Sequence, residues 1–393
     1  MAPAPVVRSA ERVARRTLAT PAELARARAA RPSPPRGDVR LWVAPANFAG
    51  QGHAWARAAA RHLDIGATSM NVAGPIRFPT DYEVPPAVYR DLTWQREQAQ
   101  ALTGWTHVLM ESQRPVLGSL YGTAEAEANA LEAVGLHVAH ICHGSDVRVP
   151  DLHAARHPFS PFRDPSDPRV GRLQRVAGPN ANMLRRTERP VFVSTPDLLD
   201  YVPGATWCPV VVDADAWSND AALLERRRPR VVHVPSNGWL KGSDRIDPLM
   251  AGLHDAGLIE YRTLRGLDRA GMRREYREAD IVLDQFVLGL YGVAAAEAMA
   301  AGRVVVAYVG DTVRRRVHDA MGEEIPIVEA TPATLVEVVK RLVAEREVAR
   351  RIAADGPTFV RRVHSPRRAA AALEPFLTPP LVEEERSDVS KPW

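Results

Sequence analysis

Short apolar runs alternate with helix-length segments along most of the chain. The run at residues 39–44 (VRLWVA) is followed by a glycine-bearing turn and by the helical pattern HAWARAAARHL, and further apolar runs follow as GATSMNV, WTHVLME and GLHVAHICHG. Each run ends near glycine or polar residues. Strands that alternate with helices in this way predict a parallel sheet with both faces covered.

The same alternation begins again in the second half of the chain. Residues 189–217, RPVFVSTPDLLDYVPGATWCPVVVDADAW, predict a strand, a short helix, another strand and an extended exit, with a domain boundary at about 209–216. Beyond it, RPRVVHVPS, LIEYRTLRG, DIVLDQF and RVVVAYVG predict further strands separated by helices. A second α/β unit is therefore expected.

These elements predict an α/β protein of two Rossmann-like, doubly wound parallel-sheet domains that face a central cleft. The expected divisions are a basic Ala/Arg-rich extension (1–37), an N-terminal domain (38–212), a C-terminal domain (213–365) and a C-terminal helix with a tail (366–393). A length of 393 residues agrees with two cores, because single hydrophobic cores stop growing below that size.

Composition adds that the chain is an ordinary globular protein, with 46% hydrophobic and 25% charged residues. The net charge of +4 is concentrated in the extension, whose eight arginines and two glutamates contribute +6 and leave −2 for the rest. We therefore expect no nucleic-acid partner. For the extension, a solvated lead-in is favoured over contact with anionic lipid or a partner, because its apolar residues are mostly alanines.

Cysteine content and hydropathy bear on the compartment. Cys142 and Cys208 are far apart and no CxxC is present, so neither a disulfide framework nor a cysteine zinc site is indicated. A reducing, cytoplasmic location is expected. The most apolar window, residues 291–310, is interrupted by Glu297 and Arg303, and no signal-peptide core follows the first arginines, so no membrane span is predicted.

The first chemical signal lies at residues 284–302, DQFVLGLYGVAAAEAMAAG. Gly289 and Gly292 flank a short apolar pair that includes Tyr291, and a helix is expected to start near Val293. Ligands in open α/β sheets lie beyond the carboxyl ends of the strands, where glycine turns and helix N-termini offer free N–H groups. The loop from Tyr291 to Val293 is therefore a candidate binding site for a diphosphate.

Glu297 lies one helical turn further on, among alanines and a methionine. A buried carboxylate needs hydrogen-bond partners, and two neighbouring hydroxyl groups, such as those of a ribose, would supply them. A glutamate on the polar face of a surface helix is the competing interpretation, and the residues alone leave both open.

A second signal, PSNGWLKGSD at residues 235–244, follows the first strand of the second domain. Lys241 and the glycine after it would bring a cation to a phosphate at this strand–helix junction, with Ser236 and Asn237 in the same loop. A solvated lysine is the ordinary alternative, because a single Lys-Gly pair is a weak signal. Asp284, which closes a later strand, is either a site residue or a loop cap.

Together these segments resemble the second domain of the retaining glycosyltransferases of family 4, which have the GT-B architecture. Counted without gaps, ADIVLDQFVLGLYGVAAAEAMAAGRVVV follows the family pattern A-D-x-x-L-x-P-S, then E-x-F-G-x-x-x-x-E-A-M-A-x-G and a strand. The resemblance is specific over about residues 230–310. It implies that Glu297 binds the ribose of a nucleotide, that Lys241 binds its diphosphate and that the first domain faces the acceptor.

Two positions depart from the family pattern. The family's first glutamate, which usually holds hydroxyl groups of the donor sugar, is Gly289 here, and the arginine usually found five residues before the lysine is Ser236. Asp284 and Gln285 could supply hydroxyl contacts instead. Because the remaining site residues still converge on one cleft, a divergent subgroup of the family is favoured.

In the first domain, HGSDVR at residues 143–148 follows an apolar strand and resembles the family's histidine loop. By that resemblance His143 would face the donor sugar near the reacting carbon. Gly50 and Gly52, in the loop NFAGQG after the first strand, would let the backbone approach donor or acceptor. The loop is no dinucleotide fingerprint, because GxGxxG is absent, and the P-loop pattern is absent too.

The sequence thus predicts a glycosyltransferase that moves a sugar from a nucleotide diphosphate, UDP or GDP, to a hydroxyl of a glycan, lipid-linked or small-molecule acceptor. Without a DxD-like pair, Lys241 and the amides of Gly292 and Val293 are the expected stabilisers of the leaving diphosphate, so transfer is expected to need neither a metal nor a cofactor. The resemblance implies retention of anomeric configuration. The turn around Arg265 is the candidate for base recognition, and peripheral membrane contact stays open.

Two other classes of function fit the same scaffold. A sugar-nucleotide epimerase or a phosphorylase is the enzymatic alternative, although a phosphorylase would need further cations around a second phosphate. A non-catalytic nucleotide-sugar-binding subunit is the other, and Gly289 and Ser236 motivate it. In the favoured interpretation Lys241, His143 and Asp284 have the catalytic roles.

Overall fold

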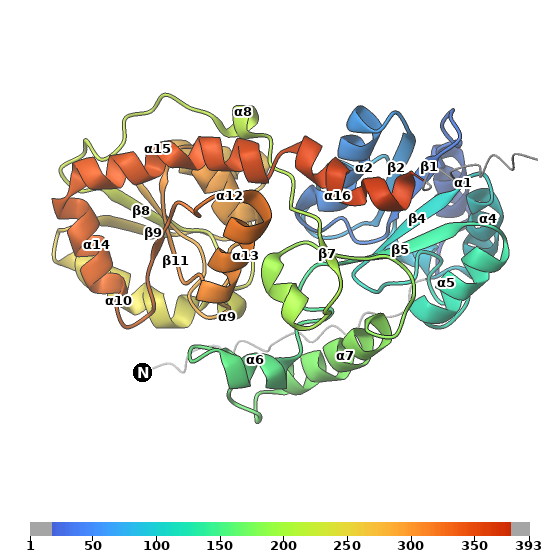
Figure 1. Ribbon diagram of the computed structural model, residues 1–393, viewed down its shortest axis with the longest axis horizontal. Coiled ribbons are helices and arrows are strands. Elements are labelled where there is room, and N and C mark those ends of the chain that lie inside the picture. The colour runs from blue at the N-terminus through green and yellow to red at the C-terminus, as the bar shows by residue number, and fades with distance from the viewer. Residues whose placement is uncertain (1–17, 379–393) are drawn as a thin grey trace, which may run out of the picture.

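The computed structural model describes residues 18–378, which form two α/β domains built on parallel sheets (Figure 1). Residues 1–17 of the predicted extension and 379–393 of the predicted tail lie outside the described part. The strands of the first domain are β1 (Arg40–Ala44), β2 (Gly66–Val72), β3 (Tyr82–Val84), β4 (His107–Glu111), β5 (His137–Cys142), β6 (Val191–Val193) and β7 (Thr206–Trp207). Those of the second are β8 (Arg230–His233), β9 (Glu260–Thr263), β10 (Ile281–Leu283), β11 (Val304–Ala307) and β12 (Ile327–Glu329).

Helices connect the strands of each domain. The first domain contains α1 (Pro21–Ala30), α2 (Gln51–His62), α3 (Pro86–Tyr89), α4 (Leu92–Leu102), α5 (Ala124–Ala133), α6 (Pro150–Arg156) and α7 (Pro168–Leu184), with short 3-10 turns at Phe48–Gly50 and Pro196–Asp200. The linker and second domain contain α8 (Ala214–Trp217), α9 (Gly238–Lys241), α10 (Ser243–Asp255), α11 (Arg269–Glu278), α12 (Val293–Ala300), α13 (Asp311–Met321), α14 (Leu335–Ala344) and α15 (Arg346–Val363). The last helix is α16 (Pro366–Leu377).

Both faces of each sheet are covered, as the alternating pattern predicts. On β1, Trp42 packs into one apolar cluster while Leu41 and Val43 pack into another, because successive side chains of a strand point to opposite faces. In the second sheet, Val282 and its neighbour Ile281 are divided between two clusters in the same way. Near-continuous apolar strands in the sequence therefore correspond to strands that are buried on both sides.

The order of the strands fixes where each sheet can bind a ligand. The first sheet runs β3-β2-β1-β4-β5-β6-β7 and the second runs β12-β11-β10-β8-β9, and all pairings are parallel. The chain changes direction across the sheet between β1 and β4 in the first domain and between β8 and β10 in the second. Doubly wound sheets bind ligands beyond the carboxyl ends of the strands at such switch points.

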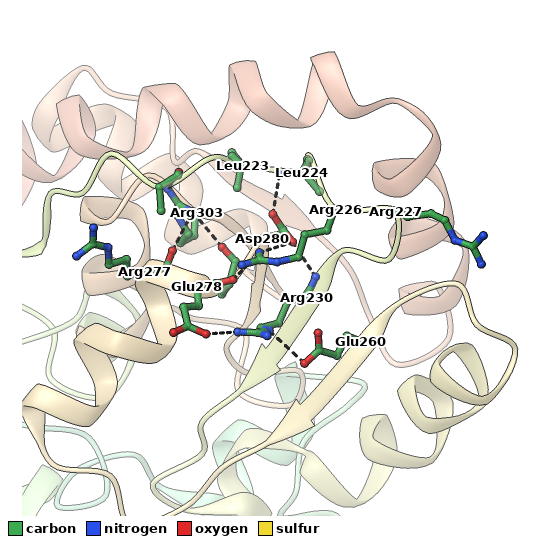
Figure 2. A network of polar contacts seen from close by, with 12 residues as sticks. Leu223, Leu224, Arg226, Arg227, Arg230, Glu260, Arg277, Glu278, Asp280 and Arg303 are labelled. Carbon is green, nitrogen blue, oxygen red and sulfur yellow. Dashed lines mark hydrogen bonds and ion pairs between the residues drawn. The ribbon is translucent and has the colours of Figure 1, made fainter.

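At the amino-terminal ends of the strands of the second sheet, opposite the ligand-binding ends, Asp280 anchors the linker that enters the domain (Figure 2). Its fully buried carboxylate accepts hydrogen bonds from Leu224 N at 2.6 Å and Arg230 N at 2.7 Å, and pairs with Arg226 at 3.3 Å. Arg303 beside it donates to backbone carbonyl oxygens of the same region. The aspartate of the family-like A-D pair therefore has a structural role, since a buried carboxylate is stable only with such partners.

The C-terminal helix returns to the first domain. Figure 1 shows α15 running along the second domain and α16 continuing onto α2. Ala369 and Leu373 of α16 are fully buried in the same apolar cluster as Trp55 of α2. Two segments of the chain, at about 208–214 and 363–366, therefore connect the domains.

Part of the predicted extension is packed against the first domain. Ala27 of α1 is 5% exposed, and its carbonyl oxygen accepts a hydrogen bond from the Tyr82 hydroxyl at 2.9 Å. Arg28 pairs with Glu97 of α4 at 2.7 Å. One face of α1 therefore contacts the first domain, where the small side chain of Ala27 lets the helix lie close, while most of residues 21–30 are exposed.

Candidate functional site

A cleft of about 850 Å³ opens between the two domains, next to both switch points. This volume is typical of ligand-binding pockets. Segments that follow β1, β4 and β5 and one side of α7 line it from the first domain, and segments that follow β8 and β10 line it from the second. Six of the site residues predicted from the sequence line this cleft: His143, Ser236, Asn237, Lys241, Gly292 and Val293.

Lys241 is the last residue of the short helix α9, and its ammonium group pairs with the carboxylate of Asp284 directly after β10. The Asp284 side chain is 2% exposed, against 18% for Lys241. The second carboxylate oxygen of Asp284 is buried without a hydrogen-bond partner within residues 18–378. Because an ammonium group has three N–H donors, Lys241 can bind a phosphate oxygen in the cleft while it stays paired with Asp284.

Gln285 folds the loop between β10 and α12. Its amide group donates to the carbonyl oxygens of Leu290 and Tyr308, and its side-chain oxygen accepts from Val287 N and Leu288 N. Gln285 is 1% exposed. Its polar atoms are used within the protein, so it is not available for the hydroxyl contacts suggested for it from the sequence.

The helix α12 begins at the cleft with an uncapped N-terminus. Gly292 is the N-cap residue, and no side chain caps the helix. The first N–H groups of a helix have no intrahelical partner, and the helix dipole places positive partial charge there. Since Gly292 and Val293 both line the cleft, an anion in the cleft can bind these N–H groups.

Gly289, which replaces the family's first glutamate, lies against the first domain. Its φ of +70° is in the left-handed region, and a Cβ atom there would lie 2.8 Å from the imidazole of His157 and 3.3 Å from Tyr308. His157 is the residue that follows α6. A glutamate at position 289 would therefore collide with His157 unless that side chain moved. The glycine that departs from the family pattern lies where the two domains come close together.

Glu297 lies on α12, one turn from the cleft-lining Val293, and its side chain is half-buried. Burial raises the pKa of Glu297 to about 7, against the opposing effects of Arg269 and Arg273. Its carboxylate has no hydrogen-bond donor among the described residues. A half-buried carboxylate beside the cleft, with no protein donor among the described residues, fits the interpretation of a residue that binds hydroxyl groups better than that of a fully exposed surface glutamate.

Arg265 follows β9 and approaches the loop that contains Ser236 and Asn237. Asn237 caps α9, with its side chain accepting from Leu240 N at 3.3 Å. A Cβ atom on Gly238 would lie 2.9 Å from the guanidinium group of Arg265. Arg265 is not among the residues that line the cleft, but it brings a positive charge next to Gly238, two residues from position 236, where the family pattern has an arginine.

His143 is held by a carboxylate that the sequence analysis missed. Glu111 ends β4 and is fully buried, and its Oε1 lies 3.1 Å from His143 Nε2. The same carboxylate accepts hydrogen bonds from Ala46 N and Asn47 N, each at 3.0 Å. Glu111 therefore fixes both His143 and the loop after β1. The available signal was an acid that closes an apolar strand next to the switch point.

Three predicted donor-binding residues lie outside the cleft lining. Gly52 is buried, and a Cβ atom there would lie 2.7 Å from the Glu111 carboxylate, so glycine makes room for that group. Gly50 caps α2 with a φ of 76°. Tyr291 is 2% exposed, and its hydroxyl lies 3.0 Å from His364 Nε2. None of the three is among the residues that line the cleft, so the structure does not bring them together with Lys241 and His143.

Three further features concern metals, membranes and thiols. Residues 18–378 contain no group of three or more His, Cys, Asp or Glu side chains arranged to hold a metal ion. No helix in that same range is both long and apolar enough to cross a membrane. Cys142 and Cys208 are buried free thiols.

This combination of two doubly wound domains and an interdomain cleft is the GT-B architecture, as the sequence predicts. HepE of Anabaena, solved with UDP and glucose, is similar, with a TM-score of 0.55 and 12% identity over 85% of this chain and 97% of its own. Sucrose-phosphate synthase of Thermosynechococcus elongatus is similar, with a TM-score of 0.57 and 13% identity over 85% of this chain and 96% of its own. The likeness covers nearly the whole of both proteins and confirms the fold.

Similarity in sequence is more limited. The curated D-inositol 3-phosphate glycosyltransferase of Geodermatophilus obscurus is 28% identical over 131 residues, which are 33% of this chain and 28% of that protein. The match therefore spans little more than a quarter of the relative's length. No protein-family model matches the sequence. Membership of glycosyltransferase family 4 thus stays a resemblance carried by the motifs.

Proposed function

We propose that the protein is a glycosyltransferase that transfers a sugar from a nucleotide diphosphate to an acceptor hydroxyl. The proposal rests on the convergence of Lys241, the uncapped N-terminus of α12 and His143 at one interdomain cleft. The first two offer positive charge and N–H donors to a diphosphate, and His143 faces them from the other domain. Because HepE was solved with UDP and with UDP-glucose, UDP is the nucleotide that we favour.

The proposed reaction is displacement at the anomeric carbon of the donor sugar. The bond between that carbon and the diphosphate oxygen breaks with its electron pair leaving on the diphosphate, and the acceptor oxygen forms the new bond. Lys241 and the amide of Val293 stabilise the leaving charge, and no metal ion is required. We propose retention, with the acceptor attacking on the leaving-group face and a diphosphate oxygen taking its proton. Glu297 holds the ribose hydroxyl groups.

The rival functions receive less support. The similar proteins are transferases and do not favour an epimerase or a phosphorylase. The non-catalytic binder was motivated by Ser236 and Gly289. Each now has a local explanation, since Arg265 brings charge near the first and His157 fills the side-chain space at the second.

A nucleotide screen tests the proposal. UDP, GDP, ADP and dTDP are each added to the purified protein, and we expect UDP to raise the Tm, since ligand at 100 times its Kd stabilises by about 2.7 kcal/mol. The UDP-sugars are then incubated with mixed acceptors with and without EDTA, and released UDP and the anomeric configuration of the product are measured. Failure of every nucleotide to bind would refute the proposal. Binding without any release of UDP would favour the non-catalytic subunit.

Glu111→Gln is expected to lower kcat about tenfold while the Kd for UDP stays nearly unchanged. The amide oxygen still accepts from the loop N–H groups, but the charged contact with His143 is lost, and charge-assisted hydrogen bonds contribute about 1.5–3 kcal/mol. Steady-state rates and UDP titration measure the two effects. Glu125→Gln, on the exposed side of α5, is the matched control. An unchanged kcat would show that Glu111 stabilises the local structure and has no effect on the reaction through His143.

A further inference from the structure

The first-domain wall of the cleft carries uncompensated positive charge. Five cationic side chains line the cleft, and two of them have carboxylate partners: Arg148 pairs with Asp197 at 2.6 Å, and Lys241 pairs with Asp284. The other three have no carboxylate partner among the described residues. These are Arg114, Arg172 and Arg175, all from the first domain.

The three arginines line the first-domain wall of the cleft, and one of them lies near His143. The guanidinium group of Arg114 lies 5.0 Å from the ring centroid of Phe48, and that ring lies 5.2 Å from the imidazole of His143. Arg172 and Arg175 are three residues apart on α7, so they lie on the same side of that helix. The charge of Arg114 therefore lies near His143, and all three arginines belong to the first domain, whereas Lys241 belongs to the second.

Two buried polar atoms on the same wall also lack partners. Gln113 is 7% exposed and Thr195 is 9% exposed, and both line the cleft. The side-chain oxygens Gln113 Oε1 and Thr195 Oγ1 have no hydrogen-bond partner within residues 18–378. A buried oxygen without a donor is costly, so these atoms are suited to hydroxyl groups of a bound molecule.

We infer that the acceptor is a polyhydroxylated compound that carries an anionic group, a phosphate or a carboxylate. The hydroxyl groups of the acceptor bind Gln113 and Thr195, and the anionic group binds the arginines, whose planar donors match phosphate and carboxylate oxygens. This inference rests on the proposed function and names the substrate class for its first-domain site.

The positions of the charges argue that the arginines serve the acceptor. The donor diphosphate has its own cation and N–H donors in Lys241 and the N-terminus of α12, both in the second domain. Arg172 and Arg175 lie on the first-domain wall, on the helix whose first turn contacts the second domain through Arg169, 4.3 Å from the ring centroid of Trp239. Among the described residues that line the cleft, Asp146 is the one carboxylate, and it cannot neutralise all three arginines. A bound anion on this wall would balance the remaining positive charge.

Matched probes test the inference. Glucose, glucose 6-phosphate and glucuronate are titrated into the full chain saturated with UDP, so that the diphosphate site is occupied, and their affinities are measured by calorimetry. We expect glucose 6-phosphate or glucuronate to bind at least tenfold more tightly than glucose. The double variant Arg172→Gln/Arg175→Gln is expected to remove at least tenfold of that preference and to leave the Kd for UDP unchanged. Arg61→Gln, on the exposed end of α2, controls for loss of surface charge.

Three results separate the possibilities. Equal affinity for glucose and both anionic probes would overturn the inference. A loss of UDP affinity in the double variant comparable with that of Lys241→Ala would overturn it too, because the arginines would then serve the donor. Arginine-dependent binding of an anionic probe in a protein that binds UDP but transfers nothing would support the anionic site while refuting the proposed transfer.

Discussion

Lys241→Ala is expected to lower the rate of sugar transfer at least tenfold, and closer to a hundredfold if diphosphate departure limits the rate. The ammonium group is the second-domain cation that lines the cleft, and its contact with the leaving diphosphate strengthens as negative charge develops. An interaction made mainly in the transition state affects kcat, so kcat and kcat/KM should fall together. Initial rates of UDP release at several donor concentrations measure both.

Removal of Lys241 also leaves the buried carboxylate of Asp284 without its partner, which can destabilise the fold by several kcal/mol. The variant Lys241→Ala/Asp284→Asn restores a neutral pair of side chains, and it should melt close to the wild type while staying inactive. Lys340→Ala, on α14, is the matched control for loss of a lysine. If the folded double variant transferred sugar at the wild-type rate, the proposed role of Lys241 in diphosphate departure would be wrong.

Glu297→Gln is expected to have two opposite effects. Binding of UDP and transfer should weaken at least tenfold, because the charged acceptor for the ribose hydroxyl groups is lost. The unliganded protein should become more stable above pH 7, because an amide in this buried position has no charge to desolvate. UDP titration and thermal melting, each from pH 5 to pH 8, measure the two effects.

The sign of the stability change follows from the raised pKa. The pKa of Glu297 is about 7 in the folded protein, against 4.5 in the unfolded chain. As the pH rises from 4.5 to 7, the unfolded chain releases this proton first, so the wild type loses stability across that interval, by up to ~3 kcal/mol. The variant lacks this loss, so the gap in Tm should widen as the pH rises towards 7 and stay level above it. A difference in Tm that does not change with pH would contradict the raised pKa, and unchanged UDP affinity would contradict the assignment of Glu297 to the ribose site. Glu337→Gln, exposed on α14, is the control.

Much of the second-domain site could be predicted from local sequence. The alternation of strands and helices located the carboxyl ends of the strands, and Lys241, Gly292 and Val293 follow two of those strands directly. The structure brings them to one cleft because the strands that precede them, β8 and β10, are neighbours in the sheet. The roles of these residues, like the cytoplasmic location and the metal independence, stay predictions.

For other predicted residues, contacts with distant parts of the chain decide where they lie. Gly52 looked like a loop glycine that approaches a ligand, but it makes room for Glu111, about sixty positions away in the chain. Tyr291 sits in a ligand-like loop, yet its hydroxyl contacts His364 in the core. Local spacing does not reveal such pairs, because the chain between them is free to place them anywhere until both sheets have formed.

The sequence by itself determined the two parallel-sheet domains, the GT-B architecture and the second-domain loops that can bind a diphosphate, because these depend on residues close together in the chain. Only the tertiary structure decided which groups complete the cleft. It brought Glu111 to His143, set His157 against Gly289, and joined the arginines of α7 with Arg114 on one wall. Each of these contacts joins separate strands or domains, and its geometry is fixed only when the sheets twist, pack and face each other.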